Sequence, residues 1–462
     1  MSARPNVVVF FTDQQRWDTV GLHGNPLNLT PHFDRLARAG AFVKNCFTCQ
    51  PVCGPARACL QTGQYATTAG VWRNGIGIDP GADTLAKSFA AAGYRTGYIG
   101  KWHLAPHADG PGAVDEKYRA GYQDWLAANA LEHTSDAYET TVYDNDGNPV
   151  ELYGYRVDAL TDAGIRYAAE HRDEPFFLTL SFLEPHHQNH RDDYPAPDGY
   201  ESRYAGRWMP ADLAALPDAY FDTDDPNRHR LGGTAHRHMA GYLGMVKRLD
   251  EALGRMTDAL KSMGILDNTI IMFISDHGCH FKTRNREYKR SCHDASIHVP
   301  CFLHGPGFEH AGELPELISL VDLPPTLLDA AGLDVPASMQ GRSLMPLVRR
   351  EKTDWPAEAY VQISESGIGR AIRTDRWTYA VEAETPNDAG GADTYTEAYL
   401  YDLQADPHQL DNLITYETFV DIRSTLRERL LQRIEAAGEP RPTIVEVPTI
   451  RAGQRRPELG GR

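Results

Sequence analysis

Short apolar runs and longer amphipathic stretches alternate along the first three quarters of the chain. The clearest run, Val7–Phe11, is continuous and rich in β-branched residues, which is typical of a strand covered on both faces. Further strands are expected at 94–99, 176–183 and 269–275, and helices at 31–40, 86–93, 157–171 and 235–264. Strand followed by helix, repeated, predicts an α/β fold with a large central, mostly parallel sheet flanked by helices.

The pattern changes near residue 355. Two short strands, at Ala371–Val381 and Ala398–Leu403, enclose a loop rich in Gly, Asp and Ala, and a long amphipathic helix follows at Tyr416–Ala437. This arrangement predicts three parts. The first is a large catalytic α/β domain over 1–354. The second is a C-terminal α+β subdomain over 355–440, with a small antiparallel sheet and a helix. The third is an extended tail over 441–462.

Composition and charge limit the partners of such a chain. It has 462 residues, of which 41% are apolar, and a formal net charge of −17. We expect no binding of nucleic acid through this acidic field, and an anion site would need a local cluster of cations. No stretch approaches the roughly 20 apolar residues of a membrane helix, so no membrane partner is expected. The run at Val7–Phe11 is too short for a signal-peptide core, which predicts a cytoplasmic protein, although a chain trimmed of its leader would read the same.

The cysteines do not form a recognisable framework. There are seven, and an odd count argues against complete disulfide pairing. Cys46 and Cys49 have the spacing of half a zinc site, but no second pair of ligands follows at a typical spacing. We therefore expect no structural zinc in this region.

The segment Cys53-Gly54-Pro55-Ala56-Arg57 predicts the start of a helix. Pro55 suits a first helical turn, because the N–H that proline lacks has no partner there. Arg57 lies four residues after Cys53 and therefore shares its face of the helix. A helix N-terminus favours an anion, and an arginine can bind a tetrahedral oxyanion through two N–H groups. Taken alone, this spacing more often marks a buried thiol near a surface arginine.

This motif resembles that of the type I sulfatases, a family of the alkaline-phosphatase-like superfamily. The chain continues with Ala58-Cys59-Leu60-Gln61-Thr62-Gly63, and the resemblance runs from Pro5-Asn6 to Leu413. It implies an alkaline-phosphatase-like fold and the hydrolysis of a sulfate ester. It also implies that a separate formylglycine-generating enzyme oxidises Cys53 to formylglycine, whose hydrated aldehyde is the nucleophile.

A metal site is expected at two strand ends. Asp13 and Asp276 each follow a buried strand, and each has a second potential ligand beside it, Gln14 and His277. Carboxylate and amide oxygens suit a hard divalent cation such as Ca²⁺. The resemblance implies that these residues hold one Ca²⁺, with the nucleophile made from Cys53 as a further ligand. His277 stands where many sulfatases have asparagine, and an imidazole suits Mn²⁺ or Zn²⁺ better, so Mn²⁺ is the alternative.

Lys101 and His103 follow another predicted strand, and residues two apart in an extended segment share a face. The resemblance implies that this pair binds a sulfate oxygen and the formylglycine, and that His103 later acts as the base that releases sulfate. It further implies catalytic roles for Arg57, for His186 with His187 as the alternative position, and for Lys289, which would bind sulfate.

Four histidines near these positions are candidates for binding the substrate: His187, His190, His293 and His298. His190 fits a solvated loop equally well. His293, Asp294 and His298 replace the Tyr, Glu and Arg that the family often has in this segment. Polar surroundings of this kind predict a polar alcohol as the leaving group and a sugar sulfate as the substrate.

Two other functions remain as alternatives. A phosphonate monoester hydrolase or phosphodiesterase of the same superfamily would share the fold, the modified cysteine and the Asp-Gln and Asp-His pairs. Such enzymes usually lack the pair formed here by Lys101 and His103. A non-catalytic binder of anions or glycans would keep Cys53 as a thiol. The sequence makes no prediction of the oligomeric state.

Overall fold

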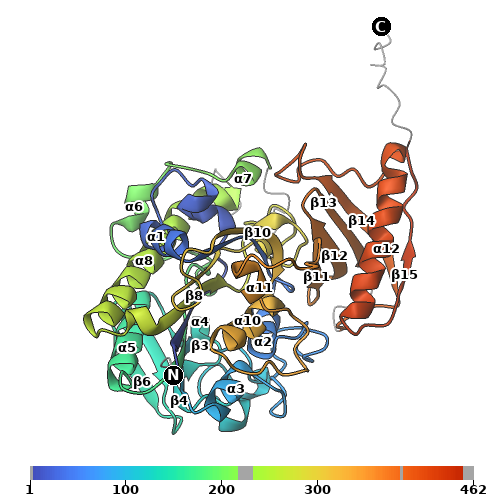
Figure 1. Cartoon of the computed structure of the whole chain (residues 1–462). Helices are drawn as coiled ribbons and strands as arrows, with labels where there is room; N and C mark the ends of the chain where they lie inside the picture. The colour runs from blue at the N-terminus through green and yellow to red at the C-terminus, as the bar shows by residue number, and fades with distance from the viewer. Residues whose placement is uncertain (1–3, 217–232, 385–388, 451–462) are drawn as a thin grey trace.

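A computed structural model describes residues 4–216, 233–384 and 389–450 of the chain (Figure 1). A ten-stranded sheet forms the centre of a large domain, and a five-stranded sheet forms a smaller one. Among the described residues, no helix combines the length and the apolar character needed to cross a bilayer.

The ten strands of the large sheet come from segments scattered along the chain. In spatial order they are β10 (Gly312–Ser319), β2 (Ala41–Phe47), β9 (Cys301–His304), β8 (Thr269–Ser275), β1 (Asn6–Thr12), β7 (Phe176–Ser181), β3 (Arg95–Lys101), β4 (Asp124–Ala128), β5 (Glu139–Tyr143) and β6 (Pro149–Tyr153). The five strands from β8 to β4 run parallel, whereas β9 and the pairs β4–β5 and β5–β6 are antiparallel. The predicted mostly parallel sheet is confirmed, with antiparallel pairs toward its edges.

The central strand β1 shows why the first apolar run is continuous. Val7, Val9 and Phe11 belong to one hydrophobic core, and Val8 and Phe10 belong to another. Successive side chains of a strand point to opposite faces, so a sheet covered on both sides needs an apolar residue at every position.

Helices cover both faces of this sheet (Figure 1). The first face packs against α2 (Cys53–Thr62), α3 (Leu85–Ala91) and α10 (Leu323–Ala330), and the second against α1 (Pro31–Ala39), α5 (Arg156–Glu170) and α8 (Gly233–Ser262). The shorter helices are α4 (Leu131–Thr134), α6 (Tyr200–Tyr204), α7 (Ala211–Ala215), α9 (Asp294–Ile297) and α11 (Met345–Val348).

The smaller domain is a five-stranded sheet with one long helix on its outer side (Figure 1). It contains β11 (Glu358–Ile363), β12 (Ile368–Thr374), β13 (Trp377–Ala383), β14 (Thr394–Asp402), β15 (Thr443–Val445) and α12 (Val420–Ala436). The stretch predicted as one strand at 371–381 is two strands, because the Thr374 hydroxyl accepts the Trp377 N–H and turns the chain. The predicted extended tail begins with β15, which pairs with β14. Residues 451–462 of that tail lie outside the described part of the chain.

The inner face of the small sheet packs against the large domain. Ala359 and Ala371 of the small sheet share a core with Phe47, at the end of β2, and with Ile297 of α9. The Arg373 guanidinium binds the Asp294 carboxylate through two contacts of 2.9 and 3.1 Å, and both side chains are largely buried.

Candidate active site

The polar residues of the predicted site follow neighbouring parallel strands. Asp13 comes directly after β1, Asp276 directly after β8, and Lys101 ends β3. His186 follows β7, which lies between β1 and β3. Parallel strands end at the same edge of a sheet, and this edge is where α/β proteins bind ligands. Helix α2 starts at this edge, with Cys53 as its first residue.

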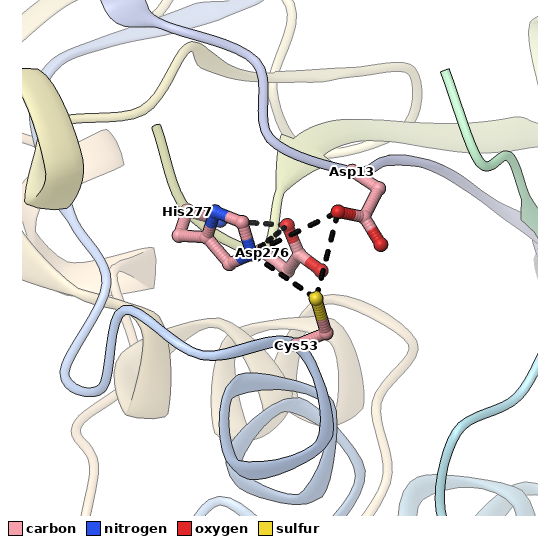
Figure 2. Close-up of side chains that lie close together, drawn as sticks. All are labelled: Asp13, Cys53, Asp276 and His277. Atoms are coloured by element: carbon pink, nitrogen blue, oxygen red, sulfur yellow. Dashed lines mark hydrogen bonds and ion pairs between the residues drawn. The ribbon is translucent and has the colours of Figure 1, made fainter. Parts of the chain in front are cut away.

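Cys53 is buried, and its sulfur is surrounded by polar groups (Figure 2). Its Sγ lies 2.8 Å from the Lys289 ammonium, 3.3 Å from His277 Nε2 and 3.7 Å from the nearer Asp13 oxygen. Burial alone would raise the pKa of this thiol, but Lys101, Lys289 and His277 lower that pKa well below its ordinary value. The side chain therefore occupies a position that stabilises negative charge.

Asp13, Cys53, Asp276 and His277 form one group that can hold a metal ion. Their potential ligand atoms all lie within 4.8 Å of one another, and all four side chains are buried. His277 Nδ1 lies 2.9 Å from the Gly278 carbonyl oxygen, which can only accept, so Nδ1 carries the hydrogen. This leaves Nε2 as a lone-pair donor facing the carboxylates, as a metal-binding histidine requires (Figure 2).

Gln14 and Asp276 provide a test of whether a cation fits here. The Gln14 amide nitrogen donates to the Tyr194 hydroxyl, and the amide oxygen is buried without a hydrogen-bond partner among the described residues. Burial and the nearby Asp13 carboxylate raise the pKa of Asp276 to about 6. A divalent cation would supply a partner for the oxygen atoms and offset the repulsion between the carboxylates, so the donor set fits such an ion.

Arg57 and Lys101 are held by the same carboxylates. Arg57 lies 2.9 Å from Asp13 and 3.3 Å from Asp276, and it also donates to the Lys101 carbonyl and the Ser181 hydroxyl. The Lys101 ammonium lies 2.8 Å from Asp13. Burial would raise the pKa of Asp13, but Lys101, His186 and Arg57 hold that pKa far below its usual range. Both cations are therefore fixed behind the metal-binding group.

Glu132, on α4, is a residue of the site that the sequence analysis missed. One carboxylate oxygen lies 3.2 Å from the Lys101 ammonium, and the other lies 4.0 Å from His103 Nδ1. Burial would raise the pKa of Glu132, but Lys101 and His103 lower it to about 2. The available signal was weak, because β4, which precedes α4, is short and has half-buried positions that give no clear pattern.

His186 and Lys289 lie on the solvent side of Cys53. Lys289 Nζ is 3.4 Å from His186 Nε2, and His186 Nδ1 donates to the His187 carbonyl. Burial and the Lys289 charge lower the pKa of His186, which favours the neutral ring. His187 stacks on His186 with ring centroids 4.3 Å apart. These contacts hold the His186 and Lys289 side chains together beside Cys53.

A cavity of about 380 Å³ opens above Cys53. Its lining includes Cys53, His103, Glu132, His186, His187 and Lys289, so most of the predicted catalytic side chains face one space. Arg57 and Lys101 are buried beneath it.

The other predicted substrate-binding histidines lie outside this cavity. His190 is exposed, and its ring contacts the side chains of Gln188 and Asp136. His293 bonds to the Tyr401 hydroxyl at 3.0 Å in the small domain, and His298 stacks on Trp17. Both rings are buried, and His293 also lines a neighbouring cavity of about 560 Å³, so the substrate contacts expected of His293 and His298 stay predictions.

Comparison with known proteins places most of the chain among sulfatases. The family model described as Sulfatase matches residues 5–333, and the model described as N-sulphoglucosamine sulphohydrolase, C-terminal, matches residues 286–436. The chain is 30% identical to the Ulvan-active sulfatase of Formosa agariphila, over 94% of this chain and 82% of that protein. It is 27% identical to an N-acetylglucosamine-6-O-sulfatase of Bacteroides thetaiotaomicron, over 89% and 82%.

Solved structures share the fold at lower identity. A protein in complex with its substrate D-glucosamine-2-N,6-O-disulfate superposes with a TM-score of 0.80 at 23% identity, covering 94% of this chain and 98% of that one. The phosphonate monoester hydrolase of Agrobacterium radiobacter gives 0.69 at 24% identity, covering 94% and 96%. These two likenesses concern the fold alone.

Proposed function

The chain belongs to the sulfatase family and is a sulfuric ester hydrolase, and from this premise we propose that it hydrolyses a saccharide sulfate with a nucleophile made from Cys53. The observation that carries the proposal is the convergence on Cys53 of a metal-binding group and three cations. Arg57, Lys101 and Lys289 come from three separate segments, and each lies within ion-pair or hydrogen-bond distance of Cys53 or Asp13.

The balance of charge explains why a metal belongs to this proposal. The three cations are matched by three buried carboxylates, those of Asp13, Asp276 and Glu132. The side chains alone therefore give no net positive charge for a sulfate. A divalent cation held by Asp13 and Asp276 would make the pocket positive within a chain whose net charge is −17.

Each side chain then has a definable role. The cation would supply positive charge for the transferring group, and formylglycine at position 53 would supply a hydroxyl nucleophile. Lys101 and Lys289, whose charges both act on residue 53, would bind sulfate oxygens. Lys289, at the open side of the pocket, holds a proton for the leaving alcohol. His103, beside Glu132, is placed to take a proton from residue 53 when sulfate is released.

The metal and the maturation step belong to the same proposal. The oxygen donors Asp13, Gln14 and Asp276 favour Ca²⁺, whereas the imidazole of His277 favours Mn²⁺. Titrating metal-free protein with each ion, while the midpoint of thermal unfolding is followed, would identify the ion that binds more tightly. Conversion of Cys53 requires a formylglycine-generating enzyme as a partner.

A saccharide substrate is supported by the polar lining of the pocket and by the named activity of the N-acetylglucosamine-6-O-sulfatase relative. The test is sulfate release from sulfated mono- and oligosaccharides, compared with an aryl sulfate, using Cys53→Ala as the inactive control. Turnover of aryl sulfates only would contradict the saccharide proposal.

Phosphonate monoester hydrolysis is the alternative within the same fold. Lys101 and His103 argue for sulfate, because both lower the pKa of the Cys53 thiol and such hydrolases usually lack this pair. An aryl phosphonate that is hydrolysed faster than the matched aryl sulfate would favour the alternative.

A further inference from the structure

Three cavities lie next to one another along the open side of the large domain. The cavity above Cys53 shares Arg286, Glu287 and Arg290 with a neighbouring cavity of about 560 Å³, here called the arginine cavity. On its other side it adjoins a cavity of about 390 Å³, here called the histidine cavity, which is lined by His103, His107, His133 and Glu132 among others. The nucleophile therefore lies in the middle of a continuous groove, with room for more than the sulfated ring.

The arginine cavity runs between the two domains. One wall is the segment 284–293 of the large domain, and the other wall is formed by residues of β12, β13 and β14 in the small domain. The arginine cavity therefore extends the groove from Cys53 toward the small sheet. A substituent of the substrate that points in this direction would therefore contact both domains.

The arginines of this cavity differ in how their charges are compensated. Arg290 is paired with Glu287 and, at 2.6 Å, with Glu365. Arg284 donates to the carbonyl oxygens of Gln409 and His408, which are neutral acceptors. Arg286 is exposed at the boundary with the Cys53 cavity.

Within the described part of the chain, Arg286 has no ion-pair or hydrogen-bond partner. Lys282, the nearby cation of the Cys53 cavity, is by contrast paired with Asp192 at 3.3 Å. Among the described residues, Arg286 is therefore a cation at this boundary without a carboxylate partner.

The histidine cavity has the opposite character. Of the described residues that line it, the charged side chains are the carboxylates of Glu132 and Glu365, and none is a lysine or arginine. Burial and the neighbouring His103 lower the pKa of His107, which favours a neutral ring. This end of the groove suits hydroxyl groups and disfavours an anion, so the two ends select different substituents.

We propose that the arginine cavity binds a second acidic group, a carboxylate or a further sulfate, on the saccharide whose sulfate ester lies at Cys53, and that Arg286 contacts that group. The proposal rests on the saccharide substrate proposed above and narrows it to a saccharide with at least two negative charges. A guanidinium can bind a carboxylate or sulfate through two parallel N–H groups. In a chain of net charge −17, such a local cation is needed to offset long-range repulsion of a doubly charged ligand.

The test is a binding measurement that does not depend on turnover. Metal-loaded Cys53→Ala protein is titrated by calorimetry with glucosamine 6-sulfate and with glucosamine-2-N,6-O-disulfate. The same titrations are then made with double variants that carry Arg286→Ala or Arg286→Lys in addition to Cys53→Ala. The disulfate is expected to bind about tenfold or more tightly than the monosulfate. Arg286→Ala should remove this difference and Arg286→Lys should keep part of it. Arg349→Ala, which removes an exposed arginine outside all three cavities, is the matched control.

Two outcomes would overturn the subsite. One is that Cys53→Ala protein binds the monosulfate and the disulfate with equal affinity, or binds neither of them. The other is an equal loss of affinity for both ligands in Arg286→Ala. Failure of the proposed function is a separate result. It would be seen if mature protein, in which Cys53 has been converted to formylglycine, released no sulfate. An aryl sulfate should be hydrolysed by the mature control variant Arg349→Ala within about twofold of the parent rate.

Discussion

Cys53 begins a helix, yet the groups that contact its sulfur come from other parts of the chain. Lys289 is 236 residues away in sequence, and His277 is 224 residues away. The sequence pointed to Cys53 and the two aspartates because a motif or a strand end marks each of them. It did not reveal Glu132, whose role depends on packing against Lys101. It also did not reveal that the His298 ring stacks on Trp17, because no sequence spacing records such a non-local contact.

Glu132→Gln is expected to lower kcat/KM for a sulfate ester by about 10- to 100-fold, because Lys101 and His103 lose the carboxylate that holds them. Steady-state kinetics of mature protein on one sulfate ester measures this. Glu201→Gln, at an exposed position of α6, is the control and should leave the rate unchanged. Full activity of Glu132→Gln would show that the Glu132 carboxylate has no role in catalysis.

The same substitution should alter stability in acid. The pKa of Glu132 is about 2 in the folded protein and lies below the ordinary value of 4.5, so ionised Glu132 stabilises the fold above about pH 4.5. That contribution is lost as the pH falls toward 2. Between about pH 5 and about pH 3, the midpoint of thermal unfolding should therefore fall more for the parent protein than for Glu132→Gln. Parallel curves for the two proteins would contradict the lowered pKa.

At the scale of elements, the site is built from the ends of strands. β1 and β8 pair in parallel from Asn6 with Thr269 to Thr12 with Ser275, so the aspartates that follow them meet at one edge. The apolar pattern predicted these strands, because both faces of the sheet are buried. It could not give the order of the ten strands, because pairing joins segments that are far apart in the sequence. The turn that separates β12 from β13 also escaped prediction, since it depends on one side-chain hydrogen bond.

The junction between the domains provides a test at this scale. Arg373→Ala would leave the Asp294 carboxylate buried without its partner, and we expect a loss of about 3–5 kcal/mol in the free energy of unfolding. Urea unfolding followed by circular dichroism measures the change. Arg376→Ala breaks a pair whose arginine is half exposed and screened by solvent, so it should cost much less than Arg373→Ala. Similar losses in the two variants would show that the buried pair does not hold the junction.

At the scale of the whole molecule, an acidic protein must attract an anionic substrate. The net charge of −17 repels such a substrate, and the buried cations of the site are balanced by Asp13, Asp276 and Glu132. From the sequence, an anion site is expected to need a local cluster of cations, and Arg57, Lys101 and Lys289 are assigned to that site. The structure adds Glu132 to the balance, and the attraction then depends on the metal.

Removal of the metal should therefore abolish anion binding. Inorganic sulfate is expected to raise the midpoint of thermal unfolding of metal-loaded protein and to have no effect after treatment with a chelator. Asp276→Asn, which removes a carboxylate of the metal-binding group, should show a much smaller response to added metal. Protection by sulfate in metal-free protein would mean that the side chains alone attract the anion.

The most direct measurement concerns the chemical state of Cys53. Protein is prepared with different amounts of formylglycine-generating enzyme, and the peptide that contains Cys53 is weighed by mass spectrometry, since conversion lowers its mass by about 18 Da. Sulfate release by each preparation is then plotted against the converted fraction. We predict that activity rises in proportion to this fraction and is absent when none of the cysteine is converted. Equal activity in unconverted protein, or in Cys53→Ala, would contradict the assignment of Cys53 as the precursor of the nucleophile.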